Sequence, residues 1–370
     1  MPILSGTPTT LPDQPATVLP TPGGPTGLGT SAVRMFHPEP QPPTATESEP
    51  KRASVTVPPL YCPDARRDDP ALGEAVNDRL VAWAGEIGIY TGRLDRLRSH
   101  KFGHLMMLAH PDSDDPERLL VAAKCGLAEW SVDDHWVDEG DNDPALIGNR
   151  LALAQAVVDP VRLPPRYRGE FEQVVADEPV LRAFRSALGS LAEIASPTQV
   201  TRLRHELACM FVGYGQEAEW RTSQRRPKVW EYLLHRYENA FFPCMVLVDP
   251  IGGYELPAHE FADARVRRTY LLAGTASVIL NDLYSMAKED PTDTNLPNLL
   301  AAEEDCSLQE AVNRTAVLHD EMMHKFETEA AALSAAGSPG LRRFLDGVWA
   351  WMGGAKQWHA TSPRYQGFTA

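Results

Sequence analysis

From Pro58 onward, apolar residues recur at three-and-four spacing, with little sustained alternation between apolar and polar positions. This spacing puts apolar side chains on one face of a helix, so it predicts a chain that is helical almost throughout. Asp115-Pro116 and Ser196-Pro197 mark helix starts, because an N-cap acceptor followed by proline favours the first turn. We expect helices at 72–89, 93–109, 116–136, 145–158, 167–176, 178–194, 198–221, 228–248, 260–289, 307–335 and 339–360. The fold class is therefore all-α.

The first part of the chain has a different composition. Fourteen of the 32 prolines lie within the first 60 residues, among Thr, Ser and Gly. Such a segment buries too little apolar area to offset its ordering entropy. We expect residues 1–57 to form a disordered Pro-rich tail, with a Pro-rich docking ligand as the alternative. Residues 58–370 then form a single α-helical domain.

Composition excludes several classes of function. The 370-residue chain has a net charge of −15 and a pI near 5.2, whereas a nucleic-acid surface requires a basic stripe. The five cysteines form no CxxC pair, which indicates a reducing compartment and argues against a zinc site. The sequence contains no apolar run long enough for a membrane span and no signal-peptide pattern at its start. We expect a cytoplasmic protein.

A polar stripe runs along the end of an otherwise apolar helix. Asn281, Ser285 and Glu289 are four residues apart and share one helix face. Their amide, hydroxyl and carboxylate oxygens are ligands that suit a hard cation such as Mg²⁺. The alternative is a solvated helix end, and the stripe alone does not separate the two.

An acidic cluster ends the helix expected at 116–136. Asp134 and Asp138 are one turn apart, and Asp133 points about 100° away from Asp134. Carboxylates this close repel each other, and a bound cation relieves the repulsion. By itself the cluster fits a solvated acidic helix end better, and a lone His135 is more often structural than a ligand.

The helix expected at 228–248 carries a break signal. Pro243 lacks an N–H and crowds the carbonyl of Asn239, so the helix should kink near 239–240. Arg236 lies one turn before the kink. The alternative is a structural kink with an arginine on the surface.

Together these features suit a diphosphate ligand. Two sets of oxygen ligands for Mg²⁺ would neutralise its charge, and cationic side chains would bind its oxygens. The sequence has no Walker-type glycine loop, which argues against a nucleotide kinase or ATPase. It also shows no nucleophile with an adjacent base, as expected for a reaction in which diphosphate simply ionises.

With these motifs in this order, residues 58–370 resemble the bacterial class I terpene cyclases. The resemblance rests on the aspartate-rich motif from Asp133 to Asp138 and on the Asn281, Ser285 and Glu289 triad. It implies a helical bundle around a central cavity, with three Mg²⁺ ions held by those residues. It also implies that Arg236, Lys288, Arg364 and Tyr365 bind the diphosphate of an isoprenoid substrate. Asn239 stands where the family commonly has Asp.

Two further stretches, 58–63 and 242–256, resemble the subgroup that makes 2-methylisoborneol. The resemblance implies ionisation of 2-methylgeranyl diphosphate, cyclisation and capture of water, in an enzyme that forms a homodimer. A sister cyclase that loses a proton to give 2-methylenebornane is the first alternative, and a sesquiterpene cyclase acting on farnesyl diphosphate is another. An isoprenyl chain-elongating transferase would need a second aspartate-rich motif. A non-catalytic helical binding protein would not explain both ligand clusters.

Overall fold

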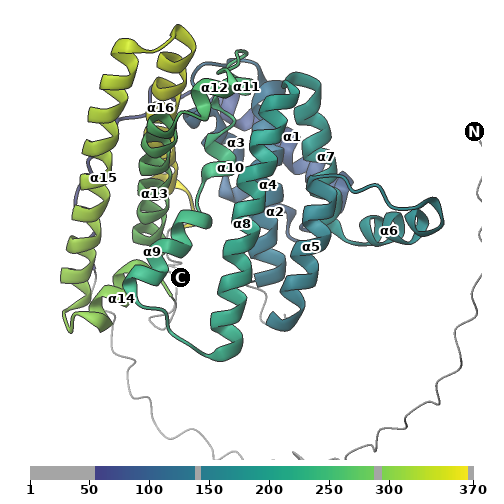
Figure 1. Ribbon diagram of the computed structural model, residues 1–370, viewed down its shortest axis with the longest axis horizontal. Coiled ribbons are helices and arrows are strands. Elements are labelled where there is room, and N and C mark those ends of the chain that lie inside the picture. The colour runs from purple at the N-terminus through teal and green to yellow at the C-terminus, as the bar shows by residue number, and fades with distance from the viewer. Residues whose placement is uncertain (1–54, 138–142, 287–293, 366–370) are drawn as a thin grey trace, which may run out of the picture. The chain divides into compact units, whose positions relative to one another are not determined.

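The computed structural model describes residues 55–137, 143–286 and 294–365, within the second of two units, Met1–Ala53 and Ser54–Ala370. The described part is helical, as the apolar spacing predicted (Figure 1). Its α-helices are α1 (Pro70–Ile87), α2 (Leu94–His100), α3 (Phe102–Ala109), α4 (Pro116–Val132), α5 (Ile147–Val158), α6 (Pro165–Asp177), α7 (Pro179–Ile194), α8 (Pro197–Ser223), α9 (Val229–Glu238), α10 (Phe242–Met245), α11 (Val248–Ile251), α12 (Ala258–Phe261), α13 (Ala264–Ser285), α14 (Leu296–Glu303), α15 (Leu308–Ala336) and α16 (Pro339–Thr361). A π-helical turn, Asp133–Val137, extends α4, and a 3₁₀ turn, Pro144–Leu146, precedes α5.

Capping residues fix where several of these helices begin. At α8, the Ser196 hydroxyl accepts from the Gln199 backbone N–H at 3.2 Å, and the Gln199 side chain accepts from the Ser196 N–H at 3.0 Å. Asp115 caps α4 in a similar way, by accepting from the Glu117 N–H. These bonds pair N–H groups that a helix start leaves without an internal acceptor.

The helical prediction was wrong in several places. The segment 93–109 is two helices, because Lys101 adopts a left-handed backbone with φ of 55°. After the break α3 packs closely on α1: a Cβ at Gly103 would lie 2.2 Å from the Asn77 nitrogen. Where one helix was expected at 260–289, residues 258–285 form two helices, α12 and α13. The short helices α11 and α14 were not predicted.

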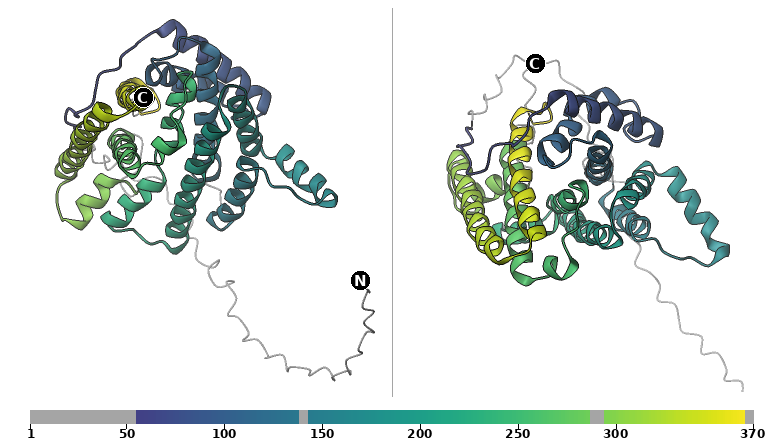
Figure 2. Two further views of the ribbon diagram at one scale, coloured as in Figure 1. Left: turned by 45° about the horizontal axis from the view of Figure 1, so that its top comes forward. Right: turned by 90° about the horizontal axis from the view of Figure 1, so that it is seen from above.

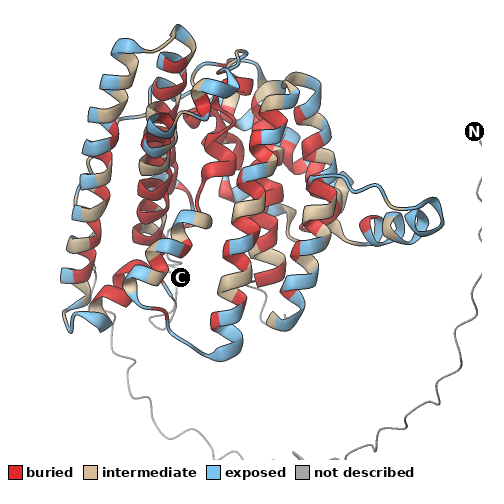
Figure 3. Cartoon of the chain, viewed as in Figure 1, coloured by how far each residue is buried: buried red, intermediate tan, exposed pale blue. Residues whose placement is uncertain are grey.

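The helices form two groups that face each other. In Figures 1 and 2, α13, α15 and α16 lie together, and α1, α4, α5, α7 and α8 form the other group. Helix α13 is buried along most of its length (Figure 3), and it packs on α15, α16, α9 and α14. Helix α4 is buried over most of its length in the second group. The ends of α13 and α4 can therefore bring their side chains to one space between the groups.

Residues before α1 run over the first group. Val55, Val57 and Leu60 pack against a small cluster formed by Leu283, Val312 and Ala316. The backbone N–H of Thr56 donates to the Gln309 side chain at 2.8 Å. This segment therefore supports the end of α13 from behind. No helix in the described residues is both long enough and apolar enough to cross a membrane.

Candidate functional site

A cavity of about 1100 Å³ lies between the two groups of helices. Residues from α4, α8, α9 and α13 line it, together with the segment that follows α16. Seven of the residues expected to bind metal or diphosphate are among them: Asp133, Asp134, Arg236, Asn281, Ser285, Arg364 and Tyr365. Residues separated by more than 200 positions in the chain thus meet at one space.

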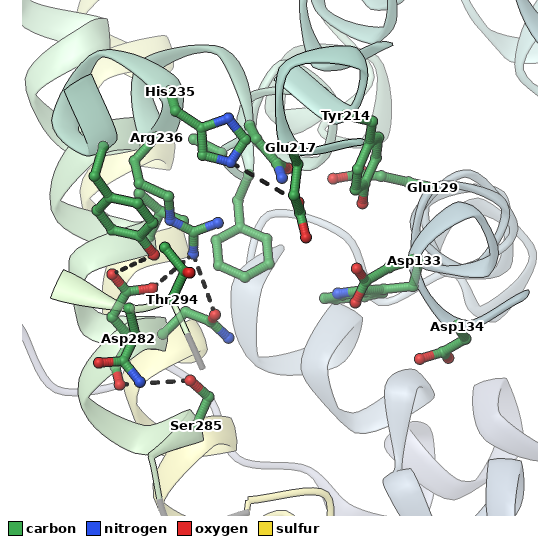
Figure 4. Close-up of a pocket in the computed structure, with 18 of the residues that line it drawn as sticks. Glu129, Asp133, Asp134, Tyr214, Glu217, His235, Arg236, Asp282, Ser285 and Thr294 are labelled. Atoms are coloured by element: carbon green, nitrogen blue, oxygen red, sulfur yellow. Dashed lines mark hydrogen bonds and ion pairs between the residues drawn. The ribbon is translucent and has the colours of Figure 1, made fainter. Parts of the chain in front are cut away.

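The first side of the cavity, here called the acidic wall, consists of Glu129, Asp133 and Asp134 (Figure 4). Asp133 and Asp134 lie in the π-helical turn that extends α4. Asp134 accepts hydrogen bonds from the Arg364 guanidinium at 3.0 Å and from the Tyr90 hydroxyl at 2.7 Å. Asp134 is therefore paired with the Arg364 cation, and both Asp133 and Asp134 line the cavity.

The opposite side, here called the α13 wall, consists of Asn281, Asp282 and Ser285. The Asn281 amide nitrogen donates to the Tyr365 hydroxyl at 3.0 Å, and it lies 3.2 Å from the His359 ring. These contacts orient the amide so that its oxygen faces Arg236, at 3.4 Å. Burial raises the pKa of Tyr365 to about 12, so its hydroxyl remains protonated at neutral pH. The C-terminal segment thus reaches both walls, through Arg364 and Tyr365.

Asp282 anchors Arg236 beneath the cavity. Its carboxylate accepts from the Arg236 guanidinium at 2.9 Å, the Tyr232 hydroxyl at 2.9 Å and the Leu296 backbone N–H at 3.2 Å. Burial raises the pKa of Asp282, and these three donors act in the opposite direction by favouring the anion. The pair fixes the guanidinium at the edge of the cavity, where Arg236 is 12% exposed.

The expected break in the helix around residue 240 is present. Helix α9 ends at Glu238 and α10 begins at Phe242, and Asn239, Ala240 and Phe241 of the intervening segment line the cavity. Two contacts with α13 hold it: the Tyr270 hydroxyl donates to the Phe242 carbonyl at 2.8 Å, and Gly274 leaves space for the Phe242 ring. A Cβ at Gly274 would lie 1.8 Å from that ring.

Away from the charged residues the cavity is aromatic. Trp130, Tyr214 and Phe241 line it, and the rings of Trp130 and Phe241 lie 5.8 Å apart. Glu129 lies among them, one turn before Asp133, and is 5% exposed. Burial raises the pKa of Glu129 to about 8, although a hydrogen bond from Cys244 acts the other way.

The donors of the two walls fit a hard cation. Both walls offer oxygen atoms, a carboxylate from Asp133 on one and the amide and hydroxyl of Asn281 and Ser285 on the other. In the described residues no three His, Cys, Asp or Glu side chains gather in an arrangement that could hold a metal ion. The donor set is therefore one of mixed oxygen ligands, which suits Mg²⁺. Asp138, Lys288 and Glu289 lie outside the described residues.

Sequence reasoning missed three side chains that organise the site. Asp282 pairs with Arg236, Tyr90 binds Asp134, and Glu129 lies in the cavity. Asp282 could have been noticed as an acidic residue within a buried helix, because such a charge needs a partner. Nothing in the sequence near Tyr90 pointed to Asp134.

A helical bundle with oxygen donors and arginines across an aromatic cavity defines a class I terpene synthase. The family model described as "Terpene synthase family 2, C-terminal metal binding" matches residues 124–325, and the chain belongs to the terpene synthase family.

Two relatives and one solved structure illustrate the similarity. The chain is 38% identical to 2-methylisoborneol synthase from Streptomyces griseus, over 92% of this chain and 78% of that protein. It is 36% identical to 2-methylisoborneol synthase from Saccharopolyspora erythraea, over 83% of this chain and 89% of that protein. The crystal structure of 2-methylisoborneol synthase from Streptomyces coelicolor A3(2) with Mg²⁺ and 2-fluoroneryl diphosphate superposes with a TM-score of 0.81. In that comparison the identity is 35%, over 86% of this chain and 99% of that one.

Proposed function

We propose that this protein converts 2-methylgeranyl diphosphate into 2-methylisoborneol and diphosphate, in a Mg²⁺-dependent ionisation, cyclisation and water capture. The observation that carries the proposal is the pair of walls, whose oxygen donors and arginines face each other across an aromatic cavity. The similarity to three 2-methylisoborneol synthases supports the same reaction.

We assign the metal ligands to both walls. Asp133, Asp134 and Asp138 would serve on the acidic wall, and Asn281, Ser285 and Glu289 on the other, for three Mg²⁺ ions. The ions supply charge neutralisation to the departing diphosphate.

We assign diphosphate binding to Arg236, Lys288, Arg364 and Tyr365. Two carboxylates fix the two arginines: the buried Asp282 holds Arg236, and the half-buried Asp134 holds Arg364. Each guanidinium has five N–H donors, so it can pair with its carboxylate and still donate to a phosphate oxygen. A guanidinium fixed before substrate arrives loses less entropy on binding than a free one.

The aromatic lining then acts on the hydrocarbon part of the substrate. Trp130, Tyr214 and Phe241 line the cavity, and the negative face of an aromatic ring attracts a cation. The same residues exclude bulk water, which would otherwise capture the carbocation before the rings close.

Product analysis tests the proposal. The purified protein would be incubated with geranyl, 2-methylgeranyl and farnesyl diphosphates, each with Mg²⁺ and with a chelator, and products identified by gas chromatography and mass spectrometry. We expect one main alcohol from the methylated substrate, lost with chelator. A hydrocarbon from that substrate would favour the 2-methylenebornane cyclase, and a product from farnesyl diphosphate alone would favour a sesquiterpene cyclase.

The unit that carries this activity is proposed to be residues 58–370, in a cytoplasmic homodimer. Size-exclusion chromatography with light scattering would test the dimer, because a mass near that of one 40.8 kDa chain would contradict it.

A further inference from the structure

Glu129 is a polar side chain inside the part of the cavity that receives hydrocarbon. It lies on α4, four residues before Asp133, so it is about 6 Å from Asp133 along the helix axis. Trp130, Phe241 and Val278 line the same cavity, and Val278 stands about one turn before Asn281 on the opposite wall. Glu129 therefore lies beyond the residues assigned to metal and diphosphate (Figure 4).

The carboxyl group of Glu129 is fixed at one oxygen and open at the other. The Cys244 thiol donates to Oε2 at 3.2 Å. Among the described residues no group donates a hydrogen bond to Oε1, and this atom is not fully enclosed by protein. Glu129 lines the cavity and Cys244 binds its Oε2, so Oε1 is the oxygen that remains for a ligand in the cavity.

The surroundings of Glu129 favour a neutral carboxyl group. No arginine, lysine or histidine within the described ranges forms an ion pair with it, and burial raises its pKa to about 8. Because the thiol donates to Oε2, the carboxyl proton belongs on Oε1, where it points into the cavity. A neutral acid is also a weaker nucleophile than a carboxylate. A carboxylate at this position would attack a carbocation and form an ester.

We propose that Glu129 holds the water molecule that ends the reaction, an inference that rests on the cyclase function proposed above. The Oε1–H group donates to the water oxygen and fixes it among apolar walls. A remaining lone pair of that oxygen forms the C–O bond to the carbocation. One O–H bond of the resulting oxonium breaks, and its proton passes to the diphosphate released in the first step.

The role predicts opposite results for two substitutions. Glu129→Gln keeps the geometry of the neutral acid, with an oxygen for the Cys244 thiol and an N–H toward the cavity, so it should retain the alcohol. Glu129→Leu removes the donor and should lower the alcohol-to-hydrocarbon ratio about tenfold, the effect of losing one hydrogen bond to the attacking water. Diphosphate release should remain within a few-fold of wild type in both variants.

The experiment measures product ratios by gas chromatography and mass spectrometry in H₂¹⁸O, diphosphate release, and melting temperature. Cys125→Ala is the matched control, because Cys125 is buried one turn earlier on α4 and does not line the cavity. We expect ¹⁸O in the wild-type alcohol and an unchanged product ratio in the control.

Several outcomes would overturn the inference. An unchanged ratio in Glu129→Leu would show that another group holds the water. If stable Glu129→Gln lost the alcohol like Glu129→Leu, the carboxylate would be the active form, contrary to the neutral role. Wild-type protein that releases diphosphate but gives only hydrocarbon would overturn the inference and leave the cyclase class intact. No diphosphate release from any substrate would instead overturn the proposed function, and the inference with it.

Discussion

The two walls of the cavity each bury a carboxyl group, and they treat it in opposite ways. Asp282 in the α13 wall receives three donors, from Arg236, Tyr232 and the Leu296 backbone. Glu129 in the acidic wall receives one thiol donor. Both are almost fully buried, so their different surroundings, rather than their depth, decide what each group can do.

This difference separates a structural charge from a chemical group. Three donors compensate the anion of Asp282, which then fixes an arginine at the cavity. One weak donor leaves Glu129 uncompensated, and the neutral acid becomes its stable form. The α13 wall depends on Arg236, Tyr232 and Tyr365. The acidic turn depends on Arg364 and Tyr90, so distant parts of the chain hold both walls.

The largest effect should come from removing the oxygen ligands of the α13 wall. We expect Asn281→Ala combined with Ser285→Ala to lower turnover at least about 1000-fold, equivalent to roughly 4 kcal/mol of transition-state stabilisation. The fold should persist, because Asp282 keeps its three donors. Turnover would be followed by diphosphate release and the fold by circular dichroism. Normal turnover would remove the metal assignment from this wall.

The same kind of truncation on the two walls should have unequal effects on stability. Asp282→Ala leaves Arg236 and the Tyr232 hydroxyl without their acceptor and should cost about 3 kcal/mol of unfolding free energy. Glu129→Leu replaces a neutral acid with an apolar side chain of similar size and should change stability by less than ~1 kcal/mol.

Urea unfolding at pH 7 would measure both variants, with Asp282→Asn as a control that retains an acceptor oxygen. Equal losses of unfolding free energy for Asp282→Ala and Glu129→Leu would show that both carboxyl groups are stabilised in the same way. That result would contradict the difference drawn between the two walls.

The same residues show which parts of the site could be predicted from the sequence. Spacing alone placed Asn281 and Ser285 on one face of a helix, and Pro243 indicated the break beside Arg236, because both signals are local in the chain. The roles of Asp282 and Glu129 were not predicted, because they depend on contacts with Leu296 and Cys244. These partners are distant in the sequence or carry no local signal, and the fold brings them into contact. The helix break at Lys101 was missed because lysine rarely adopts a positive φ.

The pH dependence of stability offers a smaller and more specific test of Glu129. Its pKa in the folded protein is about 8, above the ordinary glutamate value of 4.5. Between these pH values the folded state keeps a proton that the unfolded state has released, so this group makes stability fall as pH rises from 4.5 to 8. Between pH 5 and pH 8, we expect the melting temperature of Glu129→Gln to fall less than that of the wild-type protein. Parallel curves would show that Glu129 ionises normally and that both walls hold anions.

The smallest effect should come from shortening the N-terminus, and its size should depend on where the cut falls. Removing residues 1–53 should change unfolding free energy by less than ~0.5 kcal/mol, since the Pro-rich segment is too polar to bury much apolar area.

A cut after residue 57 also removes Val55 and Val57, which pack beside Leu283 behind the α13 wall. We expect that cut to cost about 1–2 kcal/mol, the value of two half-buried apolar side chains. It should also raise the Mg²⁺ concentration needed for half-maximal turnover, because Leu283 lies between Asn281 and Ser285 on the same helix. Thermal melting and Mg²⁺ titration of both truncated proteins would measure these effects. If the two cuts behaved identically, the residues before α1 would contribute nothing to the α13 wall, and its rigidity would come from the hydrogen bonds of Asn281 and Asp282 alone.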